Sequence, residues 1–202
     1  MITINGYDIT NDIDTNTFNY IDRADSIYGT GSFNFESTYF TNNIPPYSIL
    51  DWEGVKYCCS SEANYHYGNK SWIHNVSVIE LTALLSRFLL GSKAFSVTGT
   101  NTFDYEKINV MLSLINSKYN VNIKLNRNID NLFSKEIEYV FGAGTTLFDA
   151  LNEIARQYNH KVSVVDVIDT TIKIDFIDLN GVDYAMGNIN ILSIKKMQNR
   201  SS

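Results

Sequence analysis

The stretch WIHNVSVIELTALLSRFLLG, residues 72–91, changes its hydrophobic period at Glu80 with no glycine or proline at the change. Up to Glu80 the residues alternate with a period of two, which is typical of a strand with one buried face. Beyond Glu80 the apolar residues follow the helical period: Leu81, Leu84, Leu85 and Phe88. Gly91 stands where a left-handed residue could end a helix. The stretch therefore predicts a strand that continues directly into a short helix ending at Gly91.

Strand parity places four alternate residues of this stretch on one face: His74, Val76, Val78 and Glu80. Because the middle two are apolar, we expect this face to point inward at its centre and to become more polar toward its ends. The helix is expected to pack onto the mouth of the same β-rich module through Leu84, Leu85 and Phe88.

The composition is that of a globular protein that is not built to bind nucleic acid. The chain has 202 residues, a net charge of −6 and a mean hydropathy of −0.15. Phosphate binding needs clustered Lys and Arg, which this acidic sequence lacks. The longest apolar stretch, residues 79–90, is interrupted by charges and is too short to cross a bilayer. The N-terminal residues lack the apolar core of a secretory signal, so none is expected.

No catalytic, cofactor-binding or metal-binding residues are predicted. The two cysteines, Cys58 and Cys59, are neighbours that would point to opposite faces of a strand, so we expect inert thiols and no disulfide. The histidines lie at 66, 74 and 160, and none has metal-ligand spacing with another His or Cys. We expect His74 to be a packing residue and His160 to interact with a helix C-terminus.

Turn signals divide the chain into three segments. Residues 1–98 contain short alternating stretches with turns about ten residues apart, which predicts an antiparallel β-barrel or sandwich-like module. Within it, Asn5-Gly6 and Glu53-Gly54 are expected to be tight turns, and residues 29–31 and 67–70 are also expected to be turns. Residues 99–180 predict a small α/β domain, and residues 181–202 predict a strand returning to the β module and a polar tail.

The segment 99–180 follows the order helix, strand, strand, helix, strand, strand. Asp104 is a possible N-cap of the first helix, whose apolar stripe comprises Ile108, Met111, Leu112, Ile115 and Tyr119. Thr146 and Asp149 match a capping box at the start of the second helix. The fold class predicted for the whole chain is therefore α+β.

Residues 72–87 resemble the signature of tail hub, or tail-associated baseplate, proteins of long-tailed bacteriophages. In that family, a strand of the form aromatic-x-His-x-hydrophobic-x-hydrophobic-Ile-Glu runs into a helix of the form x-Thr-x-Leu-Leu-x-Arg. The matching residues, in order, are Trp72, His74, Val76, Val78, Ile79, Glu80, Thr82, Leu84, Leu85 and Arg87. The family usually has a proline after the glutamate, where this chain has Leu81. The resemblance also implies a barrel-like module interrupted by a small α/β domain.

The resemblance implies a structural virion protein rather than an enzyme: a hub adaptor that joins the tail tube to the spike or fibre and closes the channel. It implies a homotrimer at the tail tip, made in the cytoplasm of the bacterial host. The implied partners are further copies of the chain and the tail tube, distal tail and fibre or spike proteins, with DNA as passing cargo. An acidic channel wall would repel that DNA.

Two other functions remain open at this point. The chain could be the N-terminal module of a tail-associated cell-wall hydrolase, which would need two carboxylates roughly 5 to 10 Å apart. It could also be a ring module of a secretion channel. Glu80 and Arg87 could form an ion pair at a subunit contact or lie on a solvated surface. The candidate structural or interface residues are Trp72, His74, Glu80, Leu84, Leu85, Arg87 and Phe88.

Overall fold

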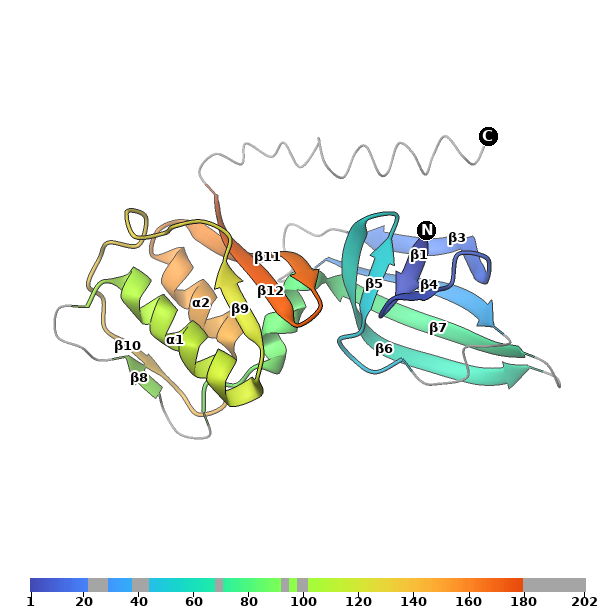
Figure 1. Ribbon diagram of the computed structural model, residues 1–202, viewed down its shortest axis with the longest axis horizontal. Helices are drawn as coiled ribbons and strands as arrows, with labels where there is room; N and C mark the ends of the chain where they lie inside the picture. The colour runs from blue at the N-terminus through green and yellow to red at the C-terminus, as the bar shows by residue number, and fades with distance from the viewer. Residues whose placement is uncertain (22–28, 38–43, 68–70, 92–94, 98–101, 180–202) are drawn as a thin grey trace.

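The computed structural model describes residues 1–21, 29–37, 44–67, 71–91, 95–97 and 102–179. The described residues form two parts that lie side by side (Figure 1). One part, the curled sheet, is a seven-stranded antiparallel sheet. The other part, the α/β unit, contains helices and two smaller sheets. The fold class is α+β, as the sequence predicted.

The curled sheet has the strand order β2-β1-β5-β6-β7-β4-β3. Its strands are β1 (Ile2–Ile4), β2 (Tyr7–Asp8), β3 (Ile13–Ile21), β4 (Thr30–Ser37), β5 (Ile49–Trp52), β6 (Val55–Tyr67) and β7 (Ser71–Glu80). Both predicted tight turns are present. Asn5 and Gly6 have φ of 50° and 84°, and Glu53 and Gly54 have φ of 52° and 91°. Left-handed backbone at both central positions matches the right-handed twist of the flanking strands.

Alternate residues of the long strands form the hydrophobic core of the curled sheet. Its core contains Ile2, Ile4, Ile9, Phe18, Phe33, Phe35, Ile44, Leu50, Cys59, Val76 and Val78. Val76 and Val78 are 1% and 0% exposed, so the predicted inward face of β7 is confirmed. Glu80, at the end of that face, is half-buried, as the expected polar gradient requires.

The α/β unit begins where β7 ends. Its elements are η1 (Leu81–Arg87), β8 (Phe95–Val97), α1 (Asp104–Tyr119), β9 (Asn122–Leu125), β10 (Tyr139–Phe141), α2 (Leu147–Arg156), β11 (His160–Ile168) and β12 (Thr171–Asp178). One sheet has the order β11-β12-β9, in which β12 pairs antiparallel with β11 and parallel with β9. The other pairs β10 with β8. The predicted order of helices and strands from α1 to β12 is confirmed.

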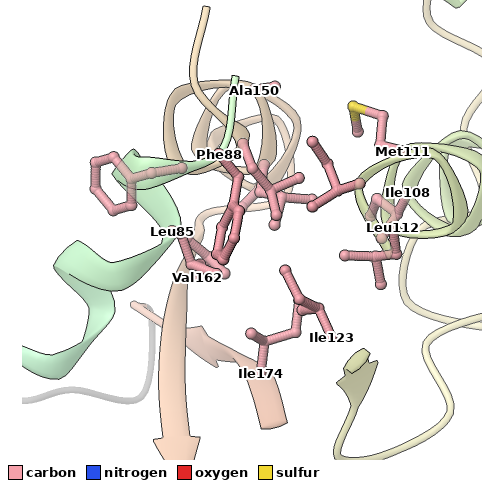
Figure 2. Packing of buried hydrophobic residues seen from close by; sticks show 14 of the residues in the cluster. Leu85, Phe88, Ile108, Met111, Leu112, Ile123, Ala150, Val162 and Ile174 are labelled. Carbon is pink, nitrogen blue, oxygen red and sulfur yellow. The ribbon is translucent and has the colours of Figure 1, made fainter. Parts of the chain in front are cut away.

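The core of the α/β unit lies between the two long helices and the three-stranded sheet, as Figure 2 shows. The predicted stripe of α1 supplies its buried residues Ile108, Met111, Leu112 and Ile115. Thr146 caps α2 by accepting a hydrogen bond from the backbone of Asp149 at 3.1 Å, so the predicted cap is confirmed. Leu85 and Phe88 reach the same core from η1 (Figure 2).

Three local predictions were wrong. The helix after Glu80 is a short 3-10 helix that ends at Arg87, and Gly91 does not cap it. The chain becomes extended at Phe88 because its carbonyl accepts a hydrogen bond from the backbone of Leu147, at 2.7 Å. Asp104 is the first residue of α1, and Phe103 is the N-cap.

The third correction concerns Gly31, which was expected to lie in a turn. It lies within β4 and pairs with Tyr20 on one side and Val78 on the other. A Cβ there would lie 2.4 Å from the carbonyl oxygen of Asn19, so the close approach of β3 requires glycine. The predicted turn at residues 67–70 lies largely outside the described residues, and the return strand predicted within residues 181–202 lies wholly outside them.

Candidate functional site at the junction of the two parts

Glu80 joins the curled sheet to the α/β unit without a loop. It is the last residue of β7 and keeps extended backbone angles, φ −52° and ψ 141°, as the N-cap of η1. Its backbone N–H donates to the carbonyl of Gly29 at 3.0 Å. Its carboxylate accepts a hydrogen bond from the Thr82 hydroxyl at 2.9 Å. The side chain of Glu80 therefore connects the end of the strand to the first turn of the helix.

The apolar residues of η1 belong to the core of the α/β unit. Leu81, Leu84, Leu85 and Phe88 are all buried there, and Leu85 is 0% exposed. The expectation that they would pack onto the mouth of the β module was therefore incomplete. Helix η1 contacts β6, but it also packs on α2 and β11. Val78 and Leu81 lie three residues apart and serve two different cores.

Strand β6 separates these two cores. Cys58 lies in the core of the α/β unit and Cys59 in the core of the curled sheet, so the predicted opposite orientations are confirmed. Both cysteines are buried, and neither forms a disulfide. Burial raises the pKa of the Cys58 thiol to about 12, and the charge of Arg87 opposes that rise. A thiol held protonated in this way is a packing group rather than a nucleophile.

Polar side chains cover the outer edge of β11, the edge strand of its sheet. The backbone N–H of Val164 donates to the Thr82 hydroxyl at 3.1 Å. Lys56, on β6, donates to the carbonyl of Val167 at 2.6 Å and to the carboxylate of Asp166 at 2.8 Å. An open strand edge invites pairing with another chain, so these contacts also protect the sheet.

His74 and Trp72 lie on the inward-facing side of β7. His74 is 0% exposed and stacks on Phe35, with ring centroids 4.4 Å apart and planes 8° apart. Trp72 is half-buried near the other end of the strand. Within the part of the chain that the structure describes, no group of His, Cys, Asp and Glu is arranged to hold a metal ion. The geometry thus gives His74 a packing role.

Glu80 and Arg87 do not form an ion pair with each other among the described residues. The guanidinium of Arg87 lies over the rings of Tyr47 and Phe88, 5.7 and 5.9 Å from their centroids. Arg87 is exposed on the surface of η1. Stacking on two rings holds its charge in one place at the surface.

A buried polar network in the α/β unit was not predicted from the sequence. Asp104 is 0% exposed and accepts hydrogen bonds from Lys107 at 3.0 Å, Tyr158 at 2.7 Å, Tyr139 at 3.1 Å and the backbone of Ile137 at 3.3 Å. Burial raises the pKa of both tyrosines, and the Asp104 carboxylate raises each further. The sequence signal was the i, i+3 spacing of Asp104 and Lys107.

An open hollow of about 470 Å³ lies on the curled sheet. Its lining residues come from β3, β4, β6 and β7: Asn19, Ile21, Thr30, Gly31, Ser32, Ser60, Ser77, Val78 and Ile79. None of these residues carries a charge. They offer hydroxyl and amide groups but no acid or base for hydrolysis.

The structure thus has two cores joined by buried contacts at β6 and η1. No helix among the described residues is long and apolar enough to span a membrane. No family model matches the sequence, and a search of curated proteins found no match.

Solved structures that resemble this fold include two prophage tail proteins and a component of a secretion system. The prophage MuSo2 43 kDa tail protein from Shewanella oneidensis has 13% identity and a TM-score of 0.44, over 74% of this chain and 46% of that one. The prophage tail protein gp18 from Listeria monocytogenes has 10% identity and a TM-score of 0.45, over 81% and 45%. An E. coli component of the type VI secretion system, itself similar to the T4 bacteriophage tail proteins gp27 and gp5, has 9% identity and a TM-score of 0.48, over 88% and 49%. The chain spans less than half of each of these structures.

Proposed function

We propose that this protein is a structural component of a phage or phage-like tail tip, a baseplate hub adaptor that joins the tail tube to the spike or fibre and closes the channel. One observation supports this most directly. The stretch 72–87, which resembles the hub signature, folds as a strand that continues without a loop into a short helix.

The motif residues in this stretch make packing contacts and structural hydrogen bonds. His74 packs on an aromatic ring, and Thr82 bonds both Glu80 and the edge of β11. Leu84 and Leu85 are buried in the core of the α/β unit. A signature whose members attach one module to another suits an adaptor, because an adaptor must hold its modules in a fixed arrangement.

The finer features of the proposal follow from the resemblance. The protein would assemble as a trimer at the tail tip of the virion, after synthesis in the bacterial host cytoplasm. Its partners would be the tail tube, distal tail and fibre or spike proteins, and DNA would only pass through. Residues 1–98 would form the tube-like module, with η1 and β8 packed on the inserted domain of residues 99–180. The net charge of −6 favours passage of DNA without adhesion.

Arg87 is the residue that we propose for a subunit contact, because its exposed charge is held in place by two rings. The test is light scattering on the purified chain, with imaging of the particle. We expect a species of three times the 23.0 kDa chain mass, and partial dissociation in Arg87→Glu. Arg156→Glu, at an exposed site on α2, is the matched control and should leave assembly unchanged. A purified chain that is monomeric, together with intact particles that lack the chain, would contradict the proposal. A band of peptidoglycan hydrolysis in a zymogram that disappears in a single carboxylate variant would also contradict it.

A further inference from the structure

We propose that Lys56, Asp166 and the Val167 carbonyl form an ionic clasp that fixes the angle between the curled sheet and the α/β unit and opens as ionic strength rises. The Lys56 ammonium lies 2.8 Å from the Asp166 carboxylate and 2.6 Å from the Val167 carbonyl oxygen. Lys56 belongs to the sheet and the other two groups to β11.

Among ion pairs between described residues, the clasp is the one that crosses between the two parts. The other two lie inside the α/β unit: Lys107 with Asp104, and Arg127 with Asp175. The chain itself crosses from sheet to unit at Glu80. Close to this crossing, the two parts also share buried contacts between η1 and β6. The clasp adds a charged attachment between β6 and the edge strand β11, which restrains the rotation that the buried contacts leave.

A β-bulge in β11 aims Asp166 at the sheet. Val164 pairs with Ile174 and Asp166 pairs with Lys173, so Val165 is an extra residue in β11. Without it, Asp166 would continue the alternation of Val162 and Val164 and face the core. With it, Asp166 shares the outer face with Lys173. Bulges characteristically redirect side chains in this way at the expense of ladder pairing.

The exposure of the pair makes it sensitive to salt. The side chains of Lys56 and Asp166 are 27% and 32% exposed, so dissolved ions reach both. Partly exposed pairs contribute little to overall stability, and the clasp can therefore open while both cores stay folded. Lys56 holds the pKa of the Asp166 carboxyl below its ordinary value, and Lys173 acts in the same direction. The pair is therefore charged at neutral pH.

The test is a distance measurement between two spin labels on the full chain. Cysteines replacing Thr30 on β4 and Val110 on α1, both exposed, carry the labels, because the native cysteines are buried. We expect one narrow distance at low salt. We expect a broader or shifted distribution in Lys56→Met and in Asp166→Asn.

Salt provides an arm of the experiment that needs no substitution in the clasp. The parent should show the same change at about 1 M salt, where the screening length falls to about 3 Å. Lys56→Arg keeps a cation that can donate to both Asp166 and the Val167 carbonyl, and it should keep the narrow distance. Arg127→Met is the matched control, because it breaks a 2.7 Å pair inside the α/β unit and should change nothing. Circular dichroism identifies variants that remain folded. An unchanged distribution in folded Lys56→Met and Asp166→Asn, or in the parent at high salt, would overturn the proposal.

Discussion

Replacing Asp104 by asparagine should destabilise the protein strongly, because Asp104 is the acceptor at the centre of a buried network. The carboxylate is 0% exposed and Lys107 is 2% exposed. The asparagine amide would keep one acceptor oxygen but would turn an NH₂ group toward donors. Lys107 would retain its 2.6 Å bond to the Ile137 carbonyl and would lose its counter-charge.

The expected cost comes from the buried charge that is left uncompensated. Breaking such a pair on one side costs about 3 to 5 kcal/mol. For a chain of this length, that loss lowers Tm by about 6 to 20 °C. Substituting both partners, Asp104→Asn with Lys107→Met, should cost less than the sum of the two single substitutions, because no unpaired charge remains.

Urea unfolding followed by circular dichroism measures these free energies, provided that the slope with urea is unchanged. Glu138→Gln is the control, since it alters an exposed carboxylate and should cost about 0.5 kcal/mol or less. A loss below about 1 kcal/mol for Asp104→Asn, or strict additivity in the double variant, would refute the reasoning about the buried pair.

Four further outcomes are expected. Leu85→Ala should cost about 2 to 5 kcal/mol in the free energy of unfolding, because Leu85 is fully buried; hydrogen exchange should accelerate in α2 and β11. The Cys58 thiol, with a pKa of about 12, should resist alkylation at pH 8 until the chain unfolds. Because unfolding lowers that pKa, stability should fall as pH rises from about 8.5 toward 12, which melting curves would reveal. A fragment of residues 81–179 should fold, and a fragment of residues 99–179 should not, because the shorter fragment lacks η1. The chemical-shift dispersion in NMR spectra of the two fragments measures this, and a well-dispersed spectrum of residues 99–179 would contradict the prediction.

Local patterns in the sequence predicted the elements well. The period of two identified the inward face of β7, and glycine after Asn5 and Glu53 identified the hairpin turns. The Thr146 cap followed from its spacing to Asp149. Each of these features is set by residues that are close in sequence, so each can be predicted from a single sequence.

Features set by distant residues could not be predicted. The helical period at Leu85 showed that one face is buried, but not that α2 and β11 cover it. Tyr158 lies 54 residues from Asp104, its hydrogen-bond partner. No residue type in the sequence marks the bulge at Val165, so the ion pair between Lys56 and Asp166 could not be predicted. The 3-10 helix ends at Arg87, earlier than predicted, because the backbone N–H of Leu147 in α2 donates to the carbonyl of Phe88.

The position of β6 between two cores has a consequence for recombination among related genes. Cys58 packs with one core and Cys59 with the other, so one strand must satisfy two sets of neighbours. A recombination event that exchanged residues 99–180 alone would replace the residues that pack against Cys58 and η1. Cys58 and η1 themselves would stay unchanged. A tolerated exchange would have to include residues 81–90 and match the size of the side chain at 58. We therefore expect the inserts of such genes to vary freely on their outer helices and to stay constrained where they contact β6.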